Sequence, residues 1–169
     1  GAVDLPPFKR KIEFKNVSFY YRKEHEVMRS ISVEIPAGKM VALVGRSGSG
    51  KSTFVNMLLR SFDPQNGSIL IDGHDLRDVT QRSMRDQIAI VSQEVDLFSR
   101  SIGENIAYGK PSATPSEIAE AAKLAFAHDF IMRSSDGYNT VVGERGVKLS
   151  GGERQRVGIA RAILKNPRI

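Results

Sequence analysis

Gly45-Arg46-Ser47-Gly48-Ser49-Gly50-Lys51-Ser52 is the stretch of this sequence that decides the fold. It follows a short continuous apolar run, Met40–Val44, and precedes an apolar helical pattern that includes Phe54 and Leu58. The apolar run reads as a strand buried on both faces. A glycine-rich loop between such a strand and a helix fits the pattern G-x-x-x-x-G-K-[ST], which binds phosphate groups. The spacing therefore predicts a phosphate-binding loop in an α/β core.

Each residue type in this loop has a physical reason. Glycines let the backbone curl so that its N–H groups converge on the phosphates, and the helix N-terminus adds a partial positive charge. Lys51 is expected to reach the outer phosphates as a catalytic cation, and the Ser52 hydroxyl is expected to ligate Mg²⁺. We therefore predict nucleotide binding through Gly45, Arg46, Ser47, Gly48, Ser49, Gly50, Lys51, Ser52 and Thr53.

The segments around the loop predict a β-rich start followed by helices. Residues 11–21 alternate apolar and polar in two stretches whose phase slips near Lys15-Asn16, which predicts a strand, a bulge or turn, and a second strand. Strands are also expected at 31–35, at 69–71 and at 88–92. Residues 103–135 are expected to be mainly helical, and Thr114-Pro115-Ser116-Glu117 is a predicted helix start. The stripe of that helix is Ile118, Ala121, Ala122, Ala125 and Phe126.

A second motif stands at the start of the last predicted helix, which runs from about Ser150 to about Leu164. The motif is Leu149-Ser150-Gly151-Gly152-Glu153. Ser150 and Glu153 have the spacing of a capping box, and on its own this stretch is explained well by helix capping. The sequence leaves open whether capping or ligand binding dominates at Ser150 in the free chain.

With the phosphate loop upstream, this motif resembles the signature of ATP-binding cassette (ABC) proteins. The resemblance covers essentially the whole chain and includes Tyr21, Gln93 and the stretch 142–146. That stretch, with 96–98 and 104–109, is similar to the exporter branch of the family. The implied fold class is α/β, a P-loop core with an N-terminal antiparallel β subdomain and a helical signature subdomain.

The resemblance also implies roles and partners. Two such domains, in a homodimer or in one chain, would bind head to tail, with each ATP between one phosphate loop and the other signature. Tyr21 would stack on adenine, although packing alone also explains an aromatic residue at a strand end. Gln93 would touch Mg²⁺ or the attacking water as a catalytic residue. Glu144 and Arg145 would face the transmembrane domains of the same transporter, or form a solvated pair. The domain would lie on the cytoplasmic or organelle-matrix side of a membrane.

The same resemblance divides the chain into residues 10–92 (β subdomain and core), 93–150 (helical subdomain) and 150–169 (signature helix). In the family, a strand with an Mg²⁺-binding Asp and a water-activating Glu follows, and a switch His comes later. The sequence as given stops before them, so we expect it to lack hydrolytic activity by itself. The three histidines, His25, His74 and His128, all precede the signature and are expected to be packing or surface residues.

Composition excludes several classes of protein. The 169 residues have no run of 18 apolar residues and no Cys, which excludes a membrane span within them, disulfides and thiolate metal sites. The net charge of +6 is scattered, so we expect no nucleic-acid partner. Two alternatives remain: a nucleotide-binding module without hydrolysis, and an ABC-type ATPase of DNA maintenance. The latter typically has a very long coiled coil before the signature, whereas Gln93 and Ser150 are 57 positions apart without heptads.

Overall fold

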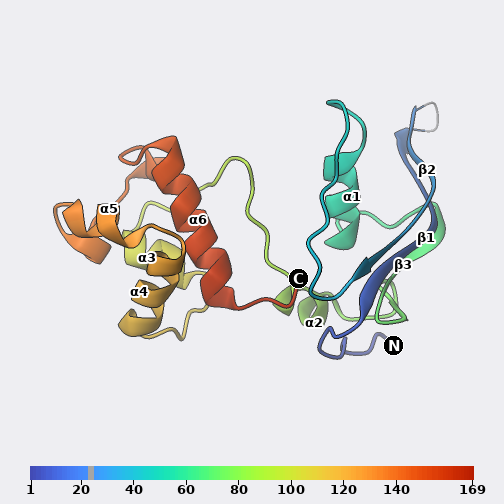
Figure 1. Cartoon of the computed structure of the whole chain (residues 1–169), viewed down its shortest axis with the longest axis horizontal. Helices are drawn as coiled ribbons and strands as arrows, with labels where there is room; N and C mark the ends of the chain where they lie inside the picture. Colours follow the sequence, from blue (N-terminus) through green and yellow to red (C-terminus); the bar gives the residue numbers. More distant parts are fainter. Residues whose placement is uncertain (23–24) are drawn as a thin grey trace. The chain divides into compact units, whose positions relative to one another are not determined.

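The computed structural model describes residues 1–22 and 25–169. The chain forms two compact units, coloured from blue to green and from yellow-green to red in Figure 1. The first contains Gly1–Ile88 with Arg168–Ile169, and the second contains Ala89–Pro167.

An antiparallel sheet forms the first unit, with strand order β2-β1-β3-β4. Its strands are β1 (Lys11–Arg22), β2 (His25–Pro36), β3 (Asn66–Ile71) and β4 (His74–Asp75). The predicted phase slip in β1 is confirmed, because the pairing with β2 shifts register between Phe14 and Val17. Asn16 within this bulge has a φ of 49°, a left-handed conformation that Asn tolerates better than most residues. The slip keeps apolar side chains of both halves in the core: Ile12, Phe14, Val17 and Phe19.

Helix α1 (Lys51–Leu58) packs its apolar face on this sheet. Phe54 stacks on Phe14 with ring centroids 3.9 Å apart, and Met57 is fully buried. The short α2 (Gln81–Asp86) adds Met84 to the same core. The residues after the phosphate loop therefore form the helix that the sequence predicts, and their burial attaches the loop to the sheet.

Two predicted strands are absent. Residues 40–44 and 88–92 are irregular, and Met40 and Val44 have exposed fractions of 100% and 90% instead of the expected burial. A strand needs a neighbour to pair its backbone N–H and C=O groups. No strand among residues 1–22 and 25–169 pairs with either segment. An apolar run therefore did not suffice to make a strand.

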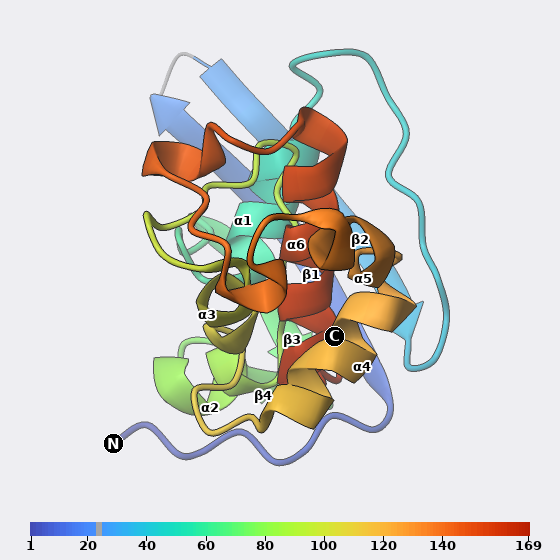
Figure 2. The same cartoon turned by 90° about the vertical axis from the view of Figure 1, so that its left-hand side faces the viewer.

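The second unit is helical. It contains α3 (Ile102–Ala107), α4 (Pro115–Leu124), α5 (His128–Arg133) and α6 (Gly151–Lys165), with 3₁₀ turns at Gly137–Asn139 and Glu144–Gly146. Helix α6 packs against α3 and α4, as Figure 2 shows. The apolar core of the unit includes Ile102, Ile106, Ala122, Ile131 and Val157.

The stripe predicted for α4 is correct except at Phe126, which is 86% exposed. The helix ends at Leu124, and Phe126 has a left-handed φ of 54° that turns its side chain out of the helical period. The predicted starts of α4 and α6 are confirmed by complete capping boxes.

The mixed α/β fold class, with an antiparallel sheet and a helical part, is confirmed. In the described part of the chain, no helix combines the length and the apolar character that crossing a bilayer requires. His74 is exposed and His128 is half-buried, whereas the side chain of His25 lies outside the described part.

Candidate functional site

The predicted phosphate loop is exposed and closes on itself through Lys51. The Lys51 ammonium donates hydrogen bonds to the carbonyl oxygens of Gly45 (2.8 Å) and Arg46 (2.7 Å) and to Ser49 Oγ (3.3 Å). Gly50 precedes the helix with a φ of 88°, which a residue with a Cβ adopts only under strain. The loop is thus curled around the lysine predicted to reach the outer phosphates.

The N-terminus of α1 has no side-chain cap. Its N-cap, Gly50, provides no side-chain hydrogen bond, and its first turn contains no acidic residue. By contrast, α4 and α6 each have a Ser or Thr cap and a Glu in the first turn. The first N–H groups of a helix have no partner within it, and the helix dipole favours an anion there. An exposed, uncapped helix start beside a lysine is suited to bind phosphate.

Tyr21, the predicted adenine contact, lies at the end of β1 and is tied to α1. Its hydroxyl is 3.0 Å from Thr53 Oγ1, in the first turn of the helix. Its ring packs edge-on with Phe19 and Phe62, at centroid distances of 4.9 Å and 5.3 Å, yet remains 54% exposed. In the first unit, one hydrogen bond therefore links the exposed Tyr21 ring to the first helical turn that follows the phosphate loop.

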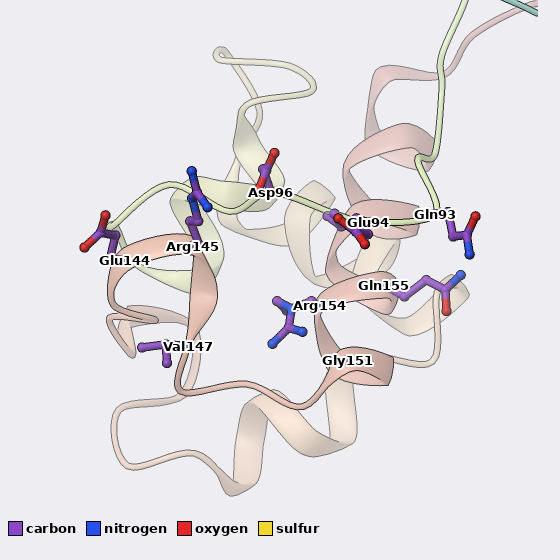
Figure 3. A pocket seen from close by; sticks show the side chains of 10 residues that line it. Gln93, Glu94, Asp96, Glu144, Arg145, Val147, Gly151, Arg154 and Gln155 are labelled. Carbon is purple, nitrogen blue, oxygen red and sulfur yellow. The ribbon is translucent and has the colours of Figure 1, made fainter. Parts of the chain in front are cut away.

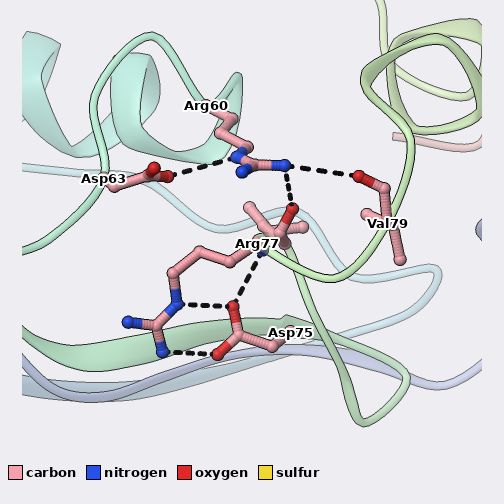
Figure 4. Close-up of polar contacts among 6 residues, drawn as sticks. Arg60, Asp63, Asp75, Arg77 and Val79 are labelled. Carbon is pink, nitrogen blue, oxygen red and sulfur yellow. Dashed lines mark hydrogen bonds and ion pairs between the residues drawn. The ribbon is translucent and has the colours of Figure 1, made fainter. Parts of the chain in front are cut away.

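The far end of α1 is held by Arg60, a residue that the sequence analysis missed. Its guanidinium donates to the carbonyl oxygens of Leu76 (2.7 Å) and Val79 (3.3 Å) and pairs with Asp63 (3.2 Å), as Figure 4 shows. Beside it, hydrogen bonds from the Arg77 guanidinium lower the pKa of Asp75. These contacts attach the helix to the turn after β4, so the phosphate loop leads into a helix that is fixed at its C-terminal end.

The predicted signature residues lie at the start of α6 in the second unit. Ser150 Oγ accepts a hydrogen bond from the Glu153 N–H (3.3 Å), and the Ser150 N–H and hydroxyl donate to the Glu153 carboxylate at 2.7 Å and 2.8 Å. The two donations from Ser150 lower the pKa of Glu153. Leu149 is buried, whereas Gly151 and Gly152 are exposed. In the free chain, Ser150 is therefore a helix cap. The sequence alone had left open whether capping or ligand binding dominates at this residue.

A hollow of about 650 Å³ lies beside the signature helix within the second unit. Figure 3 shows Gln93, Glu94 and Asp96 from the segment before α3, Glu144 and Arg145 from a 3₁₀ turn, and Arg154 and Gln155 from α6. Gln93, Glu144 and Arg145 thus line the same hollow, with Gln93 at the opposite end from the other two in Figure 3. The sequence analysis had not connected them, because they are separated by the whole helical segment.

Arg161 is a second residue that the sequence analysis missed. It lies on α6 and donates to the carbonyl oxygen of Asn105 (2.9 Å) and to its Oδ1 (3.2 Å). Its guanidinium also lies over the rings of Phe98 and Tyr108, 5.9 Å and 5.7 Å from the centroids. Burial lowers the pKa of Arg161. A cation held by neutral oxygens and rings joins α6 to the segment that follows Gln93.

The predicted site residues are thus divided between the units. Tyr21 and residues 45–53 belong to the first, and Gln93 and residues 149–153 belong to the second. Among residues 1–22 and 25–169, no group of three or more His, Asp or Glu side chains could hold a metal ion. The oxygen donors predicted for Mg²⁺, Ser52 and Gln93, suit that cation but are too few to bind it without phosphate oxygens.

Comparisons with known proteins give consistent matches. The profile of the ABC transporter family matches residues 28–169. An ATP-dependent lipid A-core flippase of Syntrophus aciditrophicus is 54% identical over 165 residues, which are 98% of this chain and 27% of the flippase. A mitochondrial iron-sulfur clusters transporter of Neurospora crassa is 52% identical over 157 residues, 93% of this chain and 22% of the transporter.

Among solved structures, a bacterial Atm1-family ABC exporter with ATP bound matches with a TM-score of 0.95 at 50% identity. The match covers 99% of this chain and 29% of the exporter chain. The chain therefore spans less than a third of the length of each of these relatives.

Proposed function

We propose, because this chain belongs to the ABC transporter family, that it is the ATP-binding part of the ATP-hydrolysing engine of an exporter. The observation that carries the proposal is the uncapped N-terminus of α1, with Lys51 as its first residue and Tyr21 hydrogen-bonded to its first turn. An aromatic ring for a base and a helix start for phosphates are the two contacts that a nucleotide needs.

The loop residues would act by binding and orienting the phosphates. Lys51 now donates to two carbonyl oxygens and a hydroxyl, all neutral acceptors. Because an ammonium group binds an anionic phosphate oxygen more strongly than a neutral oxygen, ATP would draw the Lys51 ammonium from the loop to its outer phosphates. The backbone N–H groups of the loop and of the first turn of α1 would then take up the remaining phosphate oxygens.

Mg²⁺ would bind together with ATP and not alone. The Ser52 hydroxyl and the Gln93 side-chain oxygen are the donors that we propose from this chain, and both are exposed. The cation would neutralise charge that builds up on the phosphates. The catalytic base is not assigned to any residue among the 169.

The signature would complete the ATP site of a second nucleotide-binding domain. Its start is exposed at Gly151 and Gly152, so a partner's phosphate could reach the N–H groups there. Ser150 Oγ would exchange its contact with the Glu153 carboxylate for one with that phosphate, and its own N–H would remain bound to Glu153. We therefore propose head-to-tail pairing, either in a homodimer or within one protein.

The remaining assignments follow from the same proposal. Residues 10–92 would be the β subdomain with the phosphate loop, 93–150 the helical subdomain and 150–169 the signature helix. Glu144 and Arg145 would face transmembrane domains, and this domain would lie on the cytoplasmic or matrix side of a membrane. The names of the relatives refer to cargo as different as lipid A core and iron–sulfur clusters. Cargo choice would therefore rest with the transmembrane domains.

Disulfide trapping tests the head-to-tail arrangement, since the sequence contains no Cys. One batch of protein carries Ser47→Cys in the phosphate loop, and the other carries Gly151→Cys in the signature. With Mg²⁺ and ATP, a mixture of the two should form cross-linked dimers, whereas neither batch alone should form them. Omission of ATP should abolish the cross-link. Cross-linking within a single batch would show a head-to-head arrangement and refute the proposal.

A further inference from the structure

One hydrogen bond joins the two ends of the proposed nucleotide site. It runs between the Tyr21 hydroxyl and Thr53 Oγ1 at 3.0 Å, and its partners are 32 positions apart in the sequence. Tyr21 is at the end of β1, and Thr53 is in the first turn of α1. The bond therefore connects the exposed ring to the helical turn that follows the phosphate loop.

The two partners differ in how firmly their surroundings fix them. Thr53 is 6% exposed, and its helix is anchored by the burial of Phe54 and Met57. Tyr21 is 54% exposed and meets Phe19 and Phe62 only through perpendicular ring contacts, at interplanar angles of 88°. Such edge-to-face contacts contribute only about 0.5–1.5 kcal/mol each, and more than half of the Tyr21 surface remains in solvent. The hydrogen bond to a buried hydroxyl supplies a further restraint.

We infer that Thr53 is a positioning residue for base recognition: its hydroxyl holds the Tyr21 ring ready to stack on the base. This inference rests on the proposed function and extends it, because it gives Thr53 a role that a phosphate contact alone does not. A ring already held in its binding orientation loses less conformational freedom when the base arrives, which raises affinity.

The Thr53 hydroxyl can hold the Tyr21 ring and contact a phosphate at the same time. A threonine hydroxyl has one proton and two lone pairs, and a tyrosine hydroxyl has one proton to donate. The Thr53 hydroxyl can accept a hydrogen bond from the Tyr21 hydroxyl and still donate one to a phosphate oxygen. Phosphate binding through Thr53 is therefore compatible with the restraint on the ring.

A double-mutant cycle tests the inference in the full chain, with Mg²⁺-ATP and Mg²⁺-tripolyphosphate as probes in titration calorimetry. The variants are Tyr21→Phe, which keeps the ring, Thr53→Val, which keeps the side-chain shape, and the double variant. Loss of one such bond should weaken ATP by roughly 2- to 10-fold. Because either change breaks the same bond, the double variant should lose far less than the product of the single losses. Tripolyphosphate has no base and should show no such coupling.

Three further variants separate the possible causes. Thr53→Ser restores the hydroxyl and should bind ATP nearly as the unchanged chain does. Tyr20→Phe makes the same chemical change next to Tyr21, at a hydroxyl without a hydrogen-bond partner among the described residues, and should leave ATP affinity unchanged. Lys51→Ala tests the proposed function itself.

The inference is overturned if the two losses multiply for ATP, if Thr53→Val leaves ATP affinity unchanged, or if the coupling is equally large for tripolyphosphate. In each of these cases a loss of binding in Lys51→Ala would leave the proposed function intact. Full binding in Lys51→Ala would instead refute the proposed function, and the inference with it.

Discussion

The signature helix offers a prediction in which stability and function separate. Replacing Ser150 by Ala removes the oxygen that accepts the Glu153 N–H at 3.3 Å. Loss of such an N-cap costs about 1 kcal/mol of stability, with a range of about 0.5–2 kcal/mol. If Ser150 also donates to a partner's phosphate, the loss of a hydrogen bond to a charged group adds about 1.5–3 kcal/mol to the barrier, which slows turnover roughly 10- to 150-fold.

The chain contains two matched controls for this prediction. Ser101 and Thr114 cap α3 and α4 with the same geometry, accepting N–H groups of Glu104 at 3.1 Å and Glu117 at 3.3 Å. Ser101→Ala and Thr114→Ala should therefore lose about as much stability as Ser150→Ala. They should leave ATP turnover of the full-length protein almost unchanged at a temperature where all variants are folded.

A glycine at the same position refines the test. Glycine at an N-cap costs only a few tenths of a kcal/mol, so Ser150→Gly should restore most of the stability without restoring turnover. Urea unfolding measures the stability of each variant, and phosphate release measures its ATP turnover. Monomer affinity for ATP should be unchanged in both Ser150 variants. Equal slowing of turnover by Ser101→Ala or Thr114→Ala, or normal turnover in Ser150→Gly, would refute the reasoning.

Two other predictions concern the helical unit. The Lys110 ammonium and the Thr114 N–H lower the pKa of Glu117 to about 2, from 4.5. The ionised Glu117 carboxylate therefore stabilises the fold above pH 4.5, and this contribution is lost as the pH falls toward 2. In Glu117→Gln, the urea concentration at the unfolding midpoint should depend less on pH between about 4.5 and 2. An unchanged pH dependence contradicts this. Gly109→Ala would put a Cβ 2.2 Å from the Arg161 carbonyl oxygen and should cost at least about 1–3 kcal/mol in urea unfolding. Gly151→Ala is the control, because its Cβ would meet only the Arg154 side chain, at an ordinary contact distance of 3.9 Å, and equal stability of both variants contradicts the clash.

The features that sequence predicted correctly are those set by neighbours in the chain. The caps at Thr114 and Ser150 depend on a residue three positions away, and the structure has both. The bulge near Asn16 follows from the slip in alternation within one strand. Helix α1 follows from the apolar spacing after the phosphate loop.

The features that it missed depend on distant partners. The apolar run 40–44 predicted a buried strand, but a strand also requires a neighbour, and none of the described strands pairs with it. Periodicity placed Phe126 in the stripe of α4 because it does not show where a helix ends. The contacts Tyr21–Thr53 and Arg161–Asn105 join residues 32 and 56 positions apart, and no local pattern predicts them.

The central claim is that this chain binds ATP through its phosphate loop, and comparison of two lysines tests it most directly. Lys51 holds the loop through three hydrogen bonds, whereas Lys39 is an exposed lysine just before the apolar run. Titration with a fluorescent ATP analogue in Mg²⁺ should show no binding in the millimolar range for Lys51→Ala, because the variant lacks the cation for the outer phosphates. Lys39→Ala should bind as the unchanged chain does. Unchanged affinity in Lys51→Ala would contradict the account.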